Sequence, residues 1–132
     1  MTMRESGYPS TRFALKIKHG EYMKLGYIEY MDCAHYLPNH PKCGVIHGHT
    51  YKVEVIITGE NKTGMILDFG DMKTIIRNVL AEYDHKSLND FLEYPSVENI
   101  CELLHRRFRA KWQFPFTIRV WEGEGKWAEL EE

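Results

Sequence analysis

The sequence predicts an α+β fold in which a four-stranded antiparallel sheet packs two helices on one face. Residues 47–59 and 116–122 alternate apolar and polar side chains with the period of a strand. Between them lie two stretches whose apolar residues recur at the 3.6-residue spacing of a helix. Strands followed by helices and then by strands indicate an antiparallel sheet with its helices on one face. We interpret residues 1–132 as one domain, in which residues 1–20 could form an N-terminal extension.

The first part of the chain predicts strands and a loop. Weak alternation at 12–18 and a second candidate at 25–35 predict either a hairpin, turning near Gly20, or one long bent strand. Residues 37–44 include two prolines, an asparagine and a glycine, which predicts a loop before the central strand. A cluster of turn residues at 60–64 ends that strand.

The two helices have recognisable starts. Asp68 can cap the first, and Ser96, after Pro95, can cap the second. The apolar stripe of the first helix contains Phe69, Met72, Ile75, Ile76, Val79, Leu80 and Tyr83. The stripe of the second contains Val97, Ile100, Cys101, Leu104, Phe108 and Trp112. The strand at 116–122 and a last strand at 126–130 follow, joined by a glycine turn.

Two histidines at the start of the central strand predict a metal site. His47 and His49 stand two residues apart, and residues i and i+2 of a strand share a face. Both continue the apolar face of this strand, so their imidazoles would project together from the inner side of the sheet. A third nitrogen would give the three-ligand pattern of a catalytic zinc site with one open position. His35 is the first candidate for that ligand, and His40 is its rival.

Cys43 precedes this pair by four residues and has two functional interpretations. It could act as a base beside an open metal site, since a thiolate accepts protons and attacks carbon. It could instead be the fourth ligand of a closed structural site. A buried thiol beside hydrogen-bonded core histidines is the simplest alternative.

Glu122 interrupts an apolar face at the end of the strand 116–122. The apolar members of that face are Phe116, Ile118 and Val120. A carboxylate there is rarely unpaired, so Glu122 either has a partner in the protein or binds a ligand that offers hydrogen-bond donors. An exposed glutamate beside a turn is the simpler alternative.

Asp84 and His85 stand together at the end of the first predicted helix. Such a pair can transfer protons near neutral pH. The alternative is a surface cluster in which the helix dipole favours a protonated histidine.

Composition excludes several classes of function. A formal net charge of −2 gives no electrostatic case for binding nucleic acid. No apolar run approaches the ~20 residues that a membrane span needs, and the opening residues show no signal-peptide pattern. Three cysteines without disulfide spacing favour a reducing, cytoplasmic setting.

Together these residues resemble the family of 6-pyruvoyl-tetrahydropterin synthases and 6-carboxytetrahydropterin synthases. The resemblance extends from about Tyr27 to the C-terminus and rests on separate elements in the family's order. They are Ala34-His35-Tyr36-Leu37, Cys43 to Tyr51, Asp68-Phe69, Tyr83-Asp84-His85 with Leu88-Asn89, Pro95 to Asn99, and Trp121-Glu122.

The resemblance implies the tunnelling fold (T-fold), in which small four-stranded units close into a multi-subunit barrel, here a homohexamer of two stacked trimers. Closure would remove the two open edges of such a sheet. The roles that the resemblance implies are zinc binding for His35, His47 and His49, catalysis for Cys43, Asp84 and His85, and substrate binding for Glu122 and Ser96. Cys43 would be the base, and Glu122 would accept the donor pair of a pterin ring.

The implied substrate is 7,8-dihydroneopterin triphosphate, and two lyase reactions share this machinery. One eliminates triphosphate and gives 6-pyruvoyl-tetrahydropterin in a tetrahydrobiopterin-type pathway. The other gives 6-carboxy-5,6,7,8-tetrahydropterin, acetaldehyde and triphosphate, a step toward the 7-deazaguanine nucleosides queuosine and archaeosine. The short chain and the loop at 38–43 favour the second. A third branch, in folate synthesis, has glutamate in place of Cys43, and a zinc-stabilised binding module without catalysis is the alternative outside the enzymes.

Overall fold

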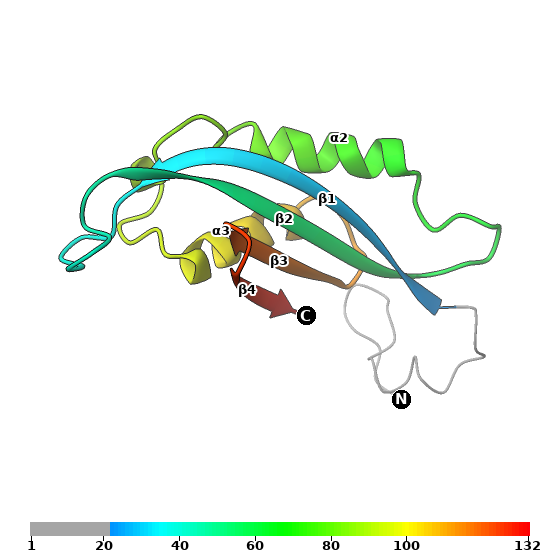
Figure 1. Cartoon of the computed structure of the whole chain (residues 1–132). Helices are drawn as coiled ribbons and strands as arrows, with labels where there is room; N and C mark the ends of the chain where they lie inside the picture. Colours follow the sequence, from blue (N-terminus) through cyan, green and yellow to red (C-terminus); the bar gives the residue numbers. More distant parts are fainter. Residues whose placement is uncertain (1–21) are drawn as a thin grey trace.

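The computed structural model describes residues 22–132 (Figure 1). The elements in chain order are β1 (Tyr22–His35), β2 (His47–Glu60), α2 (Phe69–Leu80), the 3₁₀ turn η1 (Leu88–Asp90), α3 (Val97–Arg109), β3 (Phe116–Glu122) and β4 (Lys126–Glu131). The strands form one antiparallel sheet in the order β1-β2-β3-β4. The predicted α+β fold with four strands and two helices is confirmed.

β1 and β2 make one long curved ribbon, which Figure 1 shows arching along the molecule. Their pairing runs without interruption from Tyr22 opposite Glu60 to His35 opposite His47. Within the described residues the first strand is therefore a single long strand. The strand expected at 12–18 and the turn near Gly20 lie outside the described residues.

Both helices begin where the sequence predicts. The carboxylate of Asp68 accepts hydrogen bonds from the backbone N–H groups of Gly70 and Asp71, at 2.6 and 3.4 Å. The hydroxyl of Ser96 accepts one from the backbone N–H of Asn99 at 3.2 Å. These bonds satisfy N–H groups that have no partner inside the first turn of a helix.

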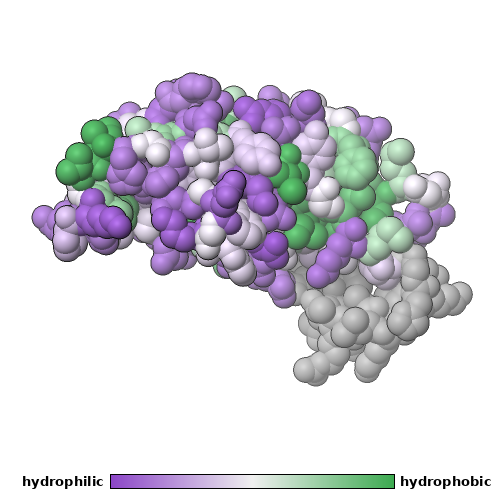
Figure 2. All heavy atoms as spheres, viewed as in Figure 1, coloured by the Kyte–Doolittle hydropathy of each residue, from purple (hydrophilic) through white to green (hydrophobic). Residues whose placement is uncertain are grey.

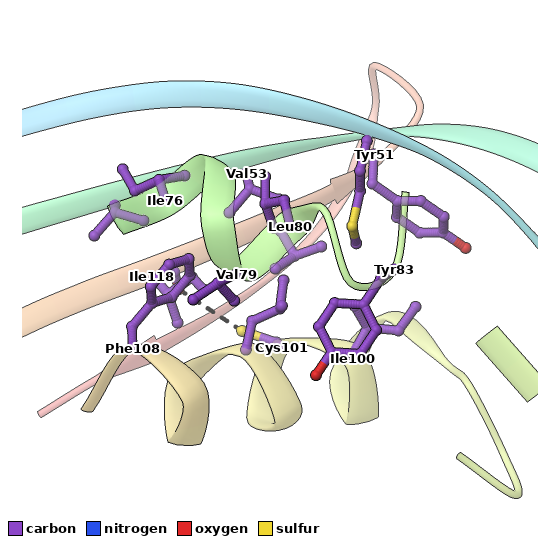
Figure 3. Packing of buried hydrophobic residues seen from close by; sticks show 14 of the residues in the cluster. Tyr51, Val53, Ile76, Val79, Leu80, Tyr83, Ile100, Cys101, Phe108 and Ile118 are labelled. Atoms are coloured by element: carbon purple, nitrogen blue, oxygen red, sulfur yellow. Dashed lines mark hydrogen bonds between the residues drawn. The ribbon is translucent and has the colours of Figure 1, made fainter. Parts of the chain in front are cut away.

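One hydrophobic core joins the sheet to the two helices. The odd-numbered residues of β2 from Tyr51 to Ile57 face α2 and α3 and are fully buried. Figure 3 shows side chains from both helices and from β2 and β3 meeting in this layer. Each large apolar side chain buried there contributes roughly 1.5–3 kcal/mol. His47, His49 and Glu122 extend the same faces of β2 and β3 to one end of this core, where the candidate site lies.

The face seen in Figure 2 is mainly polar, and hydrophobic side chains gather at the end that carries the β1–β2 loop and, over a wider area, in the opposite half of the molecule. In that loop Val45 is 75% exposed and Ile46 is 59% exposed. Among residues 22–132, neither helix has the length and apolar character to cross a bilayer.

Candidate metal centre and active site

Three histidines converge where β1 ends and β2 begins. His35 pairs with His47 in the sheet register, and His49 follows two residues later on the same face. The ligand atoms of the three imidazoles all lie within 4.8 Å of one another, and the Nε2 atoms of His35 and His47 are 3.1 Å apart. The structure thus brings together the three predicted metal ligands, whereas His40 is not part of the cluster.

Backbone carbonyls orient two of these rings. Nδ1 of His35 is 2.8 Å from the carbonyl oxygen of Pro95, and Nδ1 of His47 is 2.7 Å from that of Val45. A carbonyl can only accept a hydrogen bond, so each Nδ1 carries a proton, and Nε2 is the nitrogen of each ring that could bind a metal. Metal-binding histidines are oriented in this way by groups behind them.

The third ring completes an arrangement that fits a metal ion. Nε2 of His49 is buried and has no hydrogen-bond partner among residues 22–132. Burial lowers the pKa of His49, Glu122 raises it, and the neighbouring rings of His35 and His47 lower it, with a net lowering. A neutral imidazole is the form that binds a metal. His35, His47 and His49 could therefore hold a metal ion with three nitrogen ligands.

Glu122 lies beside this cluster. Its carboxylate oxygens are 3.7 Å from Nε2 of His35 and 3.7 Å from Nε2 of His49. Nζ of Lys126, across the β3–β4 turn, is 3.4 Å away. Of the alternatives that the sequence left open, the structure shows a partly buried carboxylate that pairs with Lys126, in a position that borders the metal site.

Cys43 lies in the β1–β2 loop, half-buried, with a free thiol. Its sulfur is not among the potential ligand atoms that cluster with the three histidines. This geometry favours an open three-nitrogen site over a closed site with a fourth, sulfur ligand.

The other two thiols are buried in the core. Burial, with the nearby carboxylates of Asp84 and Asp32, raises the pKa of Cys33 to about 12. Burial and neighbouring glutamates raise the pKa of Cys101 to about 11. Both thiols stay protonated near neutral pH, so Cys43 is the thiol suited to react.

Asp84 and His85 form a second cluster at the outer edge of β1. Oδ1 of Asp84 is 3.1 Å from Nδ1 of His85 and accepts the backbone N–H of Asp32 at 2.8 Å. Arg77 approaches Oδ2 of Asp84 at 3.5 Å. Burial alone would raise the pKa of Asp84, but the Asp32 N–H, His85 and Arg77 together lower it, so the carboxylate is ionised.

The backbone at His85 is held in an unusual conformation. Its φ angle is 62°, in the left-handed region that non-glycine residues rarely adopt, and its N–H donates to the carbonyl of Asp32 at 2.6 Å. The imidazole is 77% exposed. The acid–base role of His85 stays a prediction.

In residues 22–132, no hydrogen bond or ion pair joins the Asp84–His85 pair to Cys43. In the part of the chain that the structure describes, the hydrogen bonds and ion pairs of the two residues outside the pair go to Asp32, Arg77 and the carbonyl of Leu80. The side chains of Asp84 and His85 meet, as the sequence predicts, and their partnership with Cys43 stays a prediction.

Ser96 has the structural role that the sequence predicts, since its hydroxyl caps α3. It follows Pro95, whose carbonyl orients His35. Its role in substrate binding stays a prediction.

Sequence reasoning did not identify several residues that hold the site in place. Pro95 orients His35, Arg77 and Asp32 hold Asp84, and the ring of His40 accepts the backbone N–H of Cys43. A backbone carbonyl leaves no signal in residue type, so the contribution of Pro95 was not predictable. Arg77, in the last turn of α2, could be read only as a cation at a helix end.

Known proteins that resemble this chain share one family. A family model described as 6-pyruvoyl tetrahydropterin synthase matches residues 25–132. An Archaeoglobus fulgidus protein, provisionally named 6-carboxy-5,6,7,8-tetrahydropterin synthase, is 43% identical over 111 residues, which cover 83% of this chain and 96% of that protein. A dihydroneopterin monophosphate aldolase of Pyrococcus furiosus is 35% identical over 89 residues, which cover 65% of this chain and 78% of that protein.

The fold has a counterpart among solved structures. The Caenorhabditis elegans 6-pyruvoyl tetrahydropterin synthase superposes with a TM-score of 0.76 at 18% identity, over 84% of this chain and 96% of that one. This likeness supports the T-fold. Because the family model spans most of the sequence, the chain belongs to the 6-pyruvoyl tetrahydropterin synthase family.

Proposed function

We propose that this protein is a zinc-dependent lyase that converts 7,8-dihydroneopterin triphosphate and one water molecule to 6-carboxy-5,6,7,8-tetrahydropterin, acetaldehyde and triphosphate. The convergence of three imidazoles, with a free thiol in the preceding loop, is the observation that carries the proposal. The Archaeoglobus fulgidus relative, which bears the corresponding name, aligns over nearly its whole length. The product would feed the synthesis of 7-deazaguanine nucleosides, and the three free thiols agree with a cytoplasmic setting.

Each residue of the site has a definite task in this reaction. His35, His47 and His49 would hold zinc, which when bound polarises the side-chain hydroxyls of the substrate and acidifies the adjacent C–H and O–H bonds. Cys43, as a thiolate, would take the proton from carbon. The Asp84–His85 pair would move protons while triphosphate leaves.

Identification of the product by mass spectrometry tests the proposal. Purified, zinc-loaded protein incubated with 7,8-dihydroneopterin triphosphate should give 6-carboxy-5,6,7,8-tetrahydropterin and acetaldehyde. Accumulation of 6-pyruvoyl-tetrahydropterin would instead assign the elimination reaction, which is the second candidate. Turnover of dihydroneopterin monophosphate in preference to the triphosphate would place this chain with the Pyrococcus furiosus aldolase. If zinc stabilises the protein but neither substrate is turned over, the alternative of a zinc-stabilised binding module without catalysis would be favoured.

We expect Glu122→Gln to weaken substrate binding and to leave the zinc content unchanged. The amide keeps the shape of the side chain but replaces one acceptor oxygen by a donor group, which opposes the donor pair of the pterin ring. Charge-assisted hydrogen bonds contribute roughly 1.5–3 kcal/mol, so affinity should fall about ten- to a hundredfold. Isothermal titration with the substrate or a stable pterin measures this change.

Two results would contradict the anchoring role of Glu122. Unchanged affinity with lost turnover would make Glu122 catalytic. Loss of zinc from the variant would make the carboxylate part of the metal site, which it borders at 3.7 Å.

A closed oligomer, most simply a homohexamer of two stacked trimers, is the assembly that we expect. Residues 85–87 cover only the end of β1 next to the site, and no other described strand pairs with the outer edges of β1 and β4. Open edges tend to pair with another chain, and barrel closure removes them. An interface would also cover the exposed Val45 and Ile46 and could bring the Asp84–His85 pair of one subunit to Cys43 of another.

Light scattering at micromolar concentration is expected to show the oligomer. Co-expression of Cys43→Ala and His85→Ala chains should then restore activity that neither variant has alone. In an equal random assembly, about one shared site in four would combine Cys43 of a His85→Ala chain with His85 of a Cys43→Ala chain. A monomer, or a mixture as inactive as its parents, would contradict a site shared between subunits.

A further inference from the structure

The loop that carries Cys43 is closed by hydrogen bonds at both ends. The carbonyl of Leu37 accepts the N–H of His40 at 3.0 Å, and the N–H of Leu37 donates to the carbonyl of Cys43 at 2.7 Å. Asn39, the third residue of the turn from Leu37 to His40, has a φ angle of 65°. A turn with a positive φ at this position favours glycine or asparagine. These hydrogen bonds and the asparagine at position 39 therefore favour a single conformation of the loop.

The ring of His40 closes the middle of this loop. Its Nδ1 lies 2.8 Å from the backbone nitrogen of Cys43 and 3.1 Å from that of Lys42. Backbone N–H groups can only donate, so Nδ1 must be the unprotonated acceptor of both bonds. His40 is thus a neutral imidazole that accepts hydrogen bonds from two backbone N–H groups. This arrangement does not support the alternative in which His40 is a metal ligand.

These contacts fix the backbone of Cys43 on both sides. Its N–H is bound by His40 and its carbonyl by Leu37. The next residue, Gly44, has no room for a side chain, because a Cβ there would lie 2.7 Å from the carbonyl oxygen of His40. The thiol is the group of Cys43 that the loop leaves free to act.

We infer that His40 is the positioning residue of Cys43, and that it holds the thiol where it can take a proton from the substrate. This inference rests on the proposed function, in which Cys43 is the base. A general base must lie within hydrogen-bond reach of its proton, and a displacement of about 1 Å can cost a hundredfold in rate. His40 supplies the rigidity that a loop without regular secondary structure lacks.

The matched pair His40→Asn and His40→Leu tests the inference. The Oδ1 atom of asparagine occupies nearly the place of Nδ1 of histidine and can accept both N–H bonds, whereas leucine offers a similar shape without an acceptor. We expect kcat of the leucine variant to fall about a hundredfold with little change in KM, and the asparagine variant to keep most of the activity. Zinc content should be the same in both variants.

Hydrogen–deuterium exchange of the peptide spanning residues 40–44 gives a readout that does not depend on turnover. Its amides should exchange faster in His40→Leu and at the parental rate in His40→Asn. If the leucine variant does not fold, Gly44→Ala disturbs the same loop from the other side and should lower kcat in the same way.

Specific outcomes would overturn the inference. Parental kcat in His40→Leu despite faster exchange would show that the loop need not be rigid. Equal loss in both variants would show that the acceptor atom is not what matters, and loss of zinc would make His40 a metal ligand. If Cys43→Ala also kept full activity, the proposed function of Cys43 would fail, which separates that failure from the failure of His40 as its positioning residue.

Discussion

Replacement of His47 by alanine is expected to release the metal and to abolish activity. His47 stands opposite His35 in the sheet, and its Nε2 is 3.1 Å from that of His35, so its removal takes away one of the three nitrogen ligands. The variant should keep its fold, because His47 is half-buried at the end of a long strand and does not belong to the apolar core. Metal analysis of the purified variant and a turnover assay measure the two effects.

The matched control is His85→Ala, which removes an imidazole outside the metal cluster. This variant should keep its zinc and lose activity, so that metal binding and proton transfer are separated. Full zinc content in His47→Ala would contradict the three-histidine site.

Replacement of Cys43 by alanine is expected to lower kcat by about 10²–10⁴-fold, the usual contribution of a general base, and to retain zinc. The reason is that the three imidazoles already supply the ligands, and the sulfur of Cys43 lies outside their cluster. Loss of zinc on this substitution would mean that the thiol is a ligand.

Cys101→Ala is the control for thiol removal, since Cys101 packs in the core between α3 and the sheet and is 2% exposed. It should keep parental turnover. Brief treatment with iodoacetamide should likewise modify Cys43 before Cys33 or Cys101, because burial raises the pKa values of the latter two to about 12 and about 11. Peptide mass spectrometry identifies the modified residue.

The sequence predicted those elements whose side chains alternate between core and solvent. β2 and β3 have regular alternation because one face packs on the helices, and Asp68 and Ser96 mark the helix starts by their capping side chains. The start of β1 was less well predicted, since Met23 and Lys24 are exposed and their contribution is backbone pairing with β2. Backbone pairing does not depend on residue type and leaves no pattern.

The candidate site also has a part that the sequence predicts and a part that it does not. The histidines were predictable because strand periodicity places His47 and His49 on one face, and Glu122 extends a face of β3 toward them. The contacts of Asp84 and His85 with β1 were not predictable, because they depend on how the turn after α2 lies against the edge of β1. The support that Pro95 and His40 give to the site likewise requires the folded backbone.

X-ray absorption at the zinc edge, on zinc-loaded protein without substrate, most directly tests whether the site is an open three-nitrogen centre. The predicted result is a shell of nitrogen and oxygen neighbours at roughly 2.0–2.1 Å with no sulfur. A sulfur neighbour at about 2.3 Å would contradict it, because Cys43 would then close the site as a fourth ligand and could not serve as the base.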